Sequence, residues 1–158
     1  MFKQVQGYIA GQVAVAPPKD VKVFKLADAE AGVAGRVYYY NAGRITKCTA
    51  ATGTPAVILI ESVDADAGGA TARGYYITPG MVFKVRPSTA NEGSVGDSDD
   101  KHANFLEGIA VARFSANGDY VDWATDPASG VISVLKLALD DSGDSWLWVA
   151  FNKCFLAA

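Results

Sequence analysis

The chain has 158 residues, of which 50% are hydrophobic and 20% are charged. That length is enough for one domain with a buried core, and the composition is that of a globular protein. The net charge of −3 and the sequence pI near 5.0 argue against direct binding of nucleic acid, whose phosphates require a concentrated basic surface. No apolar run reaches the roughly 18 residues of a membrane-spanning helix, so the sequence predicts no membrane partner.

Charge is distributed unevenly along the chain. Residues 1–47 contain seven Lys or Arg and three Asp or Glu, whereas residues 48–158 contain seven and fourteen. The first part therefore carries +4 and the second −7. Such asymmetry predicts surfaces of opposite sign, which could orient the protein on a partner or on copies of itself. Solvated charge without a partner is the alternative that the sequence leaves open.

Residues 1–18 are predicted to form an extended N-terminal arm. Residues 2–16 are rich in Val, Gln, Ala and Gly without a helical stripe, and Pro17-Pro18 ends the segment by imposing an extended backbone. Three glutamines interrupt the apolar run that a secretion signal would need: Gln4, Gln6 and Gln12. We expect this arm to be dispensable for folding and a single β domain, residues 19–158, to follow it.

The β domain is predicted to begin with a short strand. Lys19 to Leu26 alternates valine with lysine, which is a strand pattern. Residues 27–35 are mostly small and are expected to connect this strand to the next, with room for one helical turn.

The clearest hairpin pattern lies between Val37 and Ile77. The strand Val37-Tyr38-Tyr39-Tyr40 meets the turn Asn41-Ala42-Gly43, and a second strand, Arg44 to Thr49, leaves it. A dense apolar run from Pro55 to Ile60, a loop rich in Asp and Gly, and a strand from Thr71 follow. Aromatic and β-branched runs separated by such turn residues predict antiparallel strands.

The rest of the chain continues the pattern of short strands and turns. Strands are predicted at Thr71 to Thr78, Met81 to Arg86, Phe105 to Ser115, Asp119 to Ala124 and Trp146 to Phe155. Turn formers separate them at Pro79-Gly80, Asn117-Gly118, Asp126-Pro127 and residues 141–144. Val131 to Leu139 fits both a helical and a strand face, and we favour a strand. The sequence therefore predicts an all-β fold, a β-barrel or β-sandwich (β-tulip-like) with an extended N-terminal arm.

The last predicted strand is apolar on both faces. Trp146, Trp148, Ala150 and Cys154 alternate with the other face, which carries Leu147, Val149, Phe151 and Phe155. A strand of this kind lies between two layers or presses against another subunit. Both alternatives remain open at this point.

No residue combination predicts catalysis, a metal site or a cofactor. The single histidine, His102, lies in the polar stretch 93–102 and cannot supply a transition-metal ligand set. Asp97, Asp99 and Asp100 could offer oxygen ligands to a cation, but a solvated loop is the simpler interpretation. Cys48 and Cys154 permit one disulfide, and two buried thiols are favoured.

Aromatic side chains suggest an alternative function, a carbohydrate-binding, lectin-like β-sandwich on a virion or cell surface. Stacking on sugar rings could involve Tyr38, Tyr39, Tyr40, Tyr75, Tyr76, Trp123, Trp146 and Trp148. Consecutive tyrosines on a strand point alternately in and out, so about half of each cluster could share a surface.

The order of motifs between Gly35 and Arg86 resembles the decoration, or cement, proteins that stud the heads of tailed bacteriophages, including the lambda-type head-stabilising proteins. The matching elements cover about a third of the chain, and their order rather than any single motif carries the resemblance. They are the turn Asn41-Ala42-Gly43, the strand Arg44 to Lys47, the run Pro55 to Glu61, Val63-Asp64-Ala65-Asp66, Gly68-Gly69 and the strand leading to Pro79-Gly80.

The resemblance implies a non-enzymatic structural protein of the virion. Such proteins form homotrimers on the outer capsid surface, where they bridge neighbouring major capsid subunits, and this one would be made in the host cytoplasm. The N-terminal arm would add a strand to the capsid, and the +4 charge of residues 1–47 would favour an acidic capsid surface. The implied capsid contacts are Phe2, Val5, Tyr8, Ile9, Val13, Val15, Lys19 and Lys22, and the implied subunit contacts are Trp146, Trp148 and Phe151.

Overall fold

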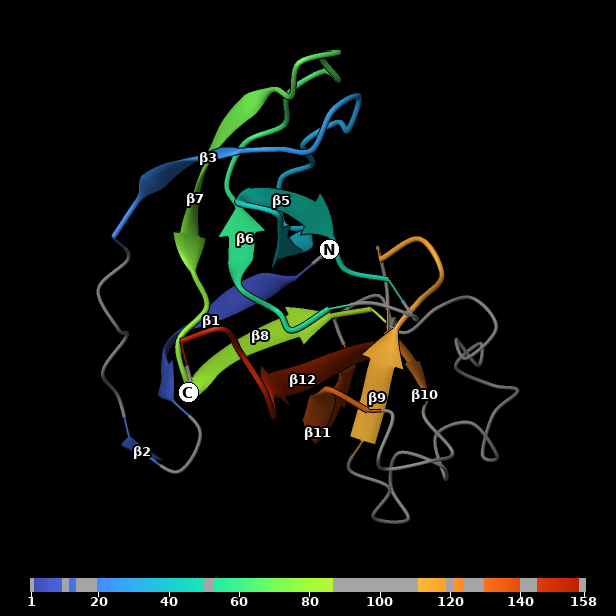
Figure 1. The fold of residues 1–158 in the computed structure, drawn as a ribbon. Helices are drawn as coiled ribbons and strands as arrows, with labels where there is room; N and C mark the ends of the chain where they lie inside the picture. Colours follow the sequence, from blue (N-terminus) through green and yellow to red (C-terminus); the bar gives the residue numbers. More distant parts are fainter. Residues whose placement is uncertain are drawn as a thin grey trace.

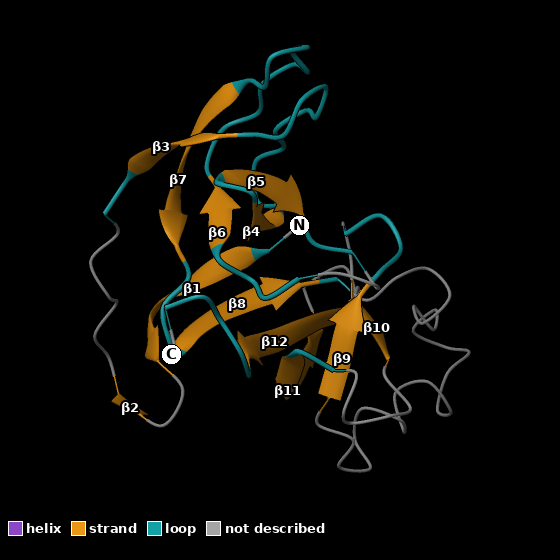
Figure 2. Cartoon of the chain, viewed as in Figure 1, coloured by secondary structure: helices purple, strands orange, loops and turns teal. Residues whose placement is uncertain are grey.

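The structure is a computed structural model that describes residues 2–9, 12–13, 20–49, 53–86, 111–118, 121–123, 130–139 and 145–156. Within these ranges the chain forms twelve β-strands and no helix, arranged as two antiparallel sheets (Figures 1 and 2). The all-β prediction is confirmed, and the arrangement is sandwich-like. Neither sheet closes into a barrel in the described part of the chain.

The smaller sheet contains the segment with the clearest hairpin pattern. Its order is β3-β7-β6-β4-β5, and its strands are β3 (Lys22–Lys25), β4 (Val37–Asn41), β5 (Arg44–Lys47), β6 (Val57–Leu59) and β7 (Thr71–Tyr76). The sheet curls so that its edges approach each other at one point. There Leu26, the residue after β3, forms an isolated bridge with Ile45 of β5, and the Ala27 N–H donates to the Ile45 carbonyl at 2.9 Å. No continuous ladder joins the two edge strands.

The larger sheet has the order β10-β9-β11-β12-β8-β1-β2. Its strands are β1 (Lys3–Ile9), β2 (Gln12–Val13), β8 (Met81–Val85), β9 (Val111–Phe114), β10 (Val121–Trp123), β11 (Ile132–Leu139) and β12 (Ser145–Phe151). Figure 1 shows this sheet below the smaller one, with β8 and β12 crossing its middle. The two sheets are joined by the chain between β7 and β8 and by the turn after β12.

Two separate cores explain why the central strands are apolar on both faces. Alternate residues of β4 and β6, such as Tyr38 and Val57, point into the curl of the smaller sheet. Their neighbours Val37 and Ile58 point instead into the core between the two sheets. All four are at most 2% exposed. A strand buried on both faces reads as a continuous apolar run rather than an alternating one, as the run from Pro55 to Ile60 does.

The connection between β3 and β4 is not helical. Residues 27–35 form turns and a bridge between Gly32 and Val63, whose backbone groups exchange two hydrogen bonds of 3.0 Å. The helical turn for which this connection has room does not form. These small residues allow a close approach instead, because a Cβ on Gly32 would lie 2.7 Å from Cγ2 of Val63.

The N-terminal segment is not a separate arm over residues 2–9. β1 pairs with β8 through Lys3 and Lys84, and through Gln4 and Phe83, while β2 pairs with β1. The Phe2 ring is 2% exposed in the core between the sheets. Deleting residues 1–16 would therefore remove a strand and a core side chain, so the structure argues against the expectation that this segment is dispensable for folding.

The strand prediction for Val131 to Leu139 is confirmed, and the strand contains an irregularity that the sequence pattern does not reveal. Val134 pairs with Val149, but the next pair in register is Lys136 with Trp148. Leu135 is therefore an extra residue, as in a β-bulge, and it is 44% exposed. A bulge reverses the inward and outward alternation of the strand, so Lys136 faces away from the core that Val134 contacts.

The hairpin turn between β4 and β5 has alanine in an unfavourable backbone conformation. φ is 50° at Ala42 and 79° at Gly43, and positive φ at both central positions of a two-residue turn is the signature of type I′. Glycine accepts this region without strain, whereas Ala costs roughly 1 to 2 kcal/mol.

Replacing Ala42 with asparagine should therefore raise the free energy of unfolding by about 0.5 to 1 kcal/mol, since Asn-Gly is a preferred type I′ pair. Urea titration followed by tryptophan fluorescence measures the change. Ala65→Asn is the matched control, because Ala65 is exposed and its φ is not positive. Equal effects of the two substitutions would contradict the assigned turn.

Candidate functional site

Of the residues predicted to contact a capsid, Phe2 and Lys22 have side chains that the structure describes. Phe2 is wrongly placed among them, because its ring packs against Phe83, Phe114 and Phe151 at centroid distances of 6.4, 5.7 and 5.5 Å. Val5, Tyr8, Ile9 and Val13 belong to β1 and β2. Val15 and Lys19 lie outside the described residues.

Lys22 is a predicted capsid contact whose described side chain lies on the surface. It is exposed on β3, and its Nζ lies 2.8 Å from Oδ2 of Asp20. The hydrogen bond to this carboxylate is the main cause that raises the pKa of the Lys22 ammonium group. The local charge around Lys22 is therefore partly neutralised.

The residues predicted to contact other subunits fall on two opposite faces of β12. Phe151 packs against the core between the sheets, together with Leu147 and Val149. Trp146 and Trp148 alternate with these residues and are half-buried on the other face. The predicted alternation of the strand is confirmed from 146 to 151. Grouping Phe151 with the two tryptophans as one contact surface is wrong.

Four positive side chains gather around the two tryptophans. Lys3 Nζ and Lys84 Nζ each lie 5.2 Å from the Trp146 ring centroid, and Arg86 Cζ lies 4.9 Å from it. Lys136 Nζ lies 4.9 Å from the Trp148 ring. We call these six residues the basic face. The sequence alone does not predict the basic face. Three of its cations lie on β1, β8 and β11, the fourth, Arg86, follows β8, and only the pairing of the strands brings them together.

A second aromatic group lies at the end of the smaller sheet near the C-terminus. The hydroxyl groups of Tyr40 and Tyr76 are 2.9 Å apart, and the Phe155 ring lies 5.0 Å from Tyr40 and 6.4 Å from Tyr76. Burial and, after it, the hydrogen bond to Tyr76 raise the pKa of Tyr40 above its ordinary value. This group anchors the chain end after β12 to the smaller sheet.

The other tyrosines considered for sugar stacking are largely buried. Tyr38 is 0% and Tyr75 is 4% exposed, and the Tyr38 hydroxyl accepts a hydrogen bond from the Val33 N–H at 2.9 Å. Burial raises the pKa of Tyr75 to about 12. The side chain of Trp123 lies outside the described part of the structure. The tyrosine runs therefore serve the cores rather than a shared sugar platform.

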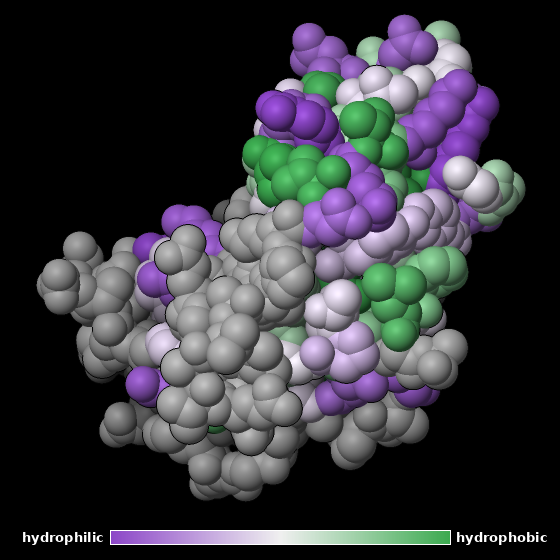
Figure 3. All heavy atoms as spheres, turned by 90° about the vertical axis from the view of Figure 1, so that its left-hand side faces the viewer, coloured by the Kyte–Doolittle hydropathy of each residue, from purple (hydrophilic) through white to green (hydrophobic). Residues whose placement is uncertain are grey.

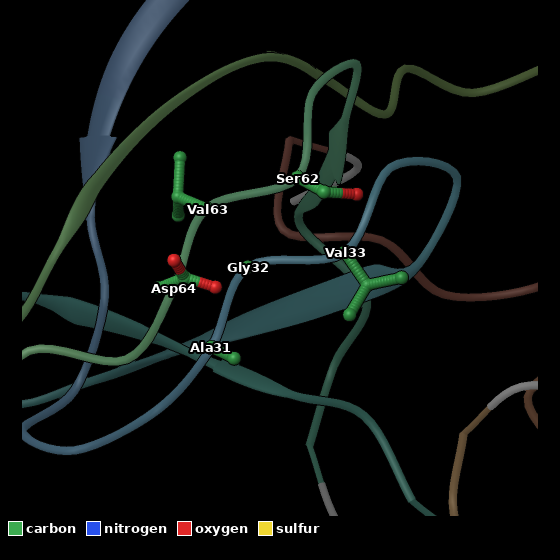
Figure 4. Close-up of a pocket in the computed structure, with 6 residues that line it drawn as sticks. All are labelled: Ala31, Gly32, Val33, Ser62, Val63 and Asp64. Carbon is green, nitrogen blue, oxygen red and sulfur yellow. The ribbon is translucent and has the colours of Figure 1, made fainter.

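An open pocket of about 510 Å³ lies beside the bridge between Gly32 and Val63. Figure 4 shows its lining on two neighbouring segments, Ala31, Gly32 and Val33 on one and Ser62, Val63 and Asp64 on the other. The Ser62 hydroxyl already accepts a hydrogen bond from the Ala34 N–H at 3.0 Å. One exposed carboxylate beside small apolar residues does not specify a ligand.

Exposed apolar side chains occur on the side of the molecule that carries β3 and the C-terminus. Val21 is 47% and Val23 68% exposed, and Phe155 and Leu156 are 49% and 46% exposed. Figure 3 views this side and shows hydrophobic areas interrupted by hydrophilic side chains. The apolar surface here is divided rather than continuous.

Other sequence features have simpler positions in the fold. Cys48 and Cys154 are buried thiols and form no disulfide, and burial raises the pKa of Cys48. The possible cation ligands Asp97, Asp99 and Asp100, together with His102, lie outside the described residues. Within the described ranges there is no cluster of three or more metal-ligating side chains. The same ranges contain no helix with the length and hydropathy needed to span a membrane.

Comparison with known proteins adds no relative. No protein-family model matches the chain, and no curated protein and no solved structure matches it either. The resemblance to capsid decoration proteins therefore depends on the motifs of this sequence.

Proposed function

We propose that this protein is a non-enzymatic structural protein that decorates and stabilises the outer surface of a tailed-phage capsid. It acts as a homotrimer that bridges neighbouring major capsid subunits, and it is made in the host cytoplasm and carried on the virion.

One observation supports this proposal above the others. The motifs whose order resembles the decoration proteins, from the turn after β4 to the strand β7, fold into one contiguous sheet with its own core. A resemblance spread over unrelated parts of the fold would carry little weight. Here the matched segment is a single structural unit, so the order of its motifs reflects one local topology.

The structure changes how such a protein could engage a capsid. Residues 3–9 form β1, which is paired with β8, so this segment cannot leave the domain as a free arm and join a capsid sheet without unpairing from β8. Contact through side chains on a rigid sheet face avoids that cost, because strand exchange requires breaking existing backbone hydrogen bonds. The proposed contact is therefore a surface of the folded domain.

The proposal is tested by mass and by binding to heads. Sedimentation should give three times the 16.6 kDa of one chain. The purified protein should also co-sediment with phage heads that lack their decoration protein and should raise the temperature at which those heads rupture. Heads of an unrelated phage serve as the control. A monomer that leaves the rupture temperature unchanged and remains in the supernatant would contradict the proposal.

A further inference from the structure

A row of side chains crosses four adjacent strands on the outer side of the larger sheet. Lys3 of β1 is directly opposite Lys84 of β8, Lys84 is opposite Trp148 of β12, and Trp148 is opposite Lys136 of β11. Directly paired residues of antiparallel strands point to the same face. The row therefore lies on one face, opposite to the face on which Phe83 and Val149 are buried in the core.

The bulge in β11 is what completes this row. If Leu135 were regularly paired instead of bulged, Lys136 would lie two positions after Val134 and would share its face, which packs against the core. The bulge turns Lys136 outward and places it opposite Trp148. Bulges commonly re-aim a side chain in this way, and they recur at functional surfaces.

The three lysines of the basic face, Lys3, Lys84 and Lys136, concentrate positive charge on one face of the larger sheet. Ion pairs between described side chains all lie within residues 20–73. Lys3, Lys84 and Lys136 take part in none of them and are held by contacts with the indole rings. A cation over a ring keeps its full charge, so an approaching anion would relieve the mutual repulsion of these groups.

We propose that the basic face binds a carboxylate-rich protein surface. This inference rests on the proposed function, in which that surface belongs to the capsid. The row spans three inter-strand spacings, about 14 Å, which suits an acidic patch or a short acidic segment of a folded partner. Two copies of the chain meeting through this same face would oppose like charges, which disfavours its use as a symmetric self-contact.

The same geometry disfavours nucleic acid and neutral sugars as the partner. Stacking of a base or a sugar needs an open ring face, but cations lie over the Trp146 and Trp148 rings. A carboxylate group needs no open ring face, because it contacts the cations themselves.

The test uses the full chain and a double charge reversal, Lys84→Glu with Lys136→Glu. Both side chains project from the outer face, so the fold should persist, and a milder variant with glutamine at both positions checks this. The matched control is Lys25→Glu with Lys153→Glu. This control changes the net charge by the same amount, also at exposed positions. Lys25 belongs to the smaller sheet, and the chain near Lys153 turns toward that sheet, where the Phe155 N–H donates to the Pro55 carbonyl.

Binding is measured by tryptophan fluorescence with poly-L-glutamate and with an oligothymidylate of equal charge, and then with phage heads. Poly-L-glutamate should bind the natural protein in a salt-sensitive manner. The charge reversal should weaken this binding at least about tenfold, and the control should change it less than about threefold.

Several outcomes would overturn the inference. They are no binding of poly-L-glutamate, an equal loss in the control, tighter binding of oligothymidylate, or head binding that the charge reversal leaves intact. Binding of poly-L-glutamate through this face by a protein that ignores all heads would contradict the proposed function and support the basic face.

Discussion

Replacing Phe2 with alanine should lower the free energy of unfolding by about 3 to 5 kcal/mol, the usual cost of removing a buried aromatic side chain. The Phe2 ring is 2% exposed and contacts three other phenylalanine rings. Its N–H also donates to the Gly35 carbonyl at 2.9 Å. A loss of this size is a large part of the 5 to 15 kcal/mol that stabilises a typical domain.

Urea titration of Phe2→Ala measures the loss, and Phe155→Ala is the control. Phe155 is also a phenylalanine near a chain end, but it is 49% exposed, so its replacement should cost about 1 kcal/mol. A Phe2→Ala protein as stable as the natural one would show that the Phe2 side chain does not contribute to the core between the two sheets. That result would support the prediction that residues 1–18 form an extended arm.

Replacing Gly118 with alanine should destabilise the protein by at least about 3 kcal/mol, because two unfavourable terms act together. The residue has φ of 76°, a region that L side chains rarely adopt. A Cβ there would also lie 2.1 Å from the carbonyl oxygen of Cys48. Backbone atoms cannot move aside as a flexible side chain can, so the turn between β9 and β10 would separate from the smaller sheet.

Gly43→Ala separates the backbone cost from the steric clash. The φ of Gly43, 79°, is close to that of Gly118, but a Cβ on Gly43 would meet nothing within 4 Å. We expect a loss of about 1 to 2 kcal/mol from the backbone conformation alone. Thermal unfolding of both variants gives the comparison. Similar losses for the two glycines would mean that the contact between the turn and Cys48 is absent in solution.

Much of the local structure was predictable from the sequence. The turn at residues 41–43 was expected and occurs, because Gly43 accepts the positive φ that its position requires. Strands β7, β8 and β12 begin within one residue of their predicted starts. The alternation of Trp146, Leu147, Trp148 and Val149 was also predicted, since a strand places successive side chains on opposite faces.

The candidate site was not predictable in the same way. Lys3, Lys84 and Lys136 are far apart in the chain and look like ordinary solvated charges. The bulge at Leu135 reverses the alternation of β11, and an apolar pattern with period two does not reveal such an insertion. The prediction instead placed capsid contacts in the first 22 residues, because an apolar segment before Pro17-Pro18 resembles an arm.

The sequence by itself determined the all-β class, the hairpin turn at residues 41–43 and the alternation of the last strand. These features follow from local backbone preferences and from the period of two in a strand. Only the tertiary structure decided that β1 lies beside β8, that Phe2 closes a core and that four cations surround two tryptophans. Pairing between distant strands depends on which surfaces pack together, and that choice is made by contacts between residues far apart in the chain.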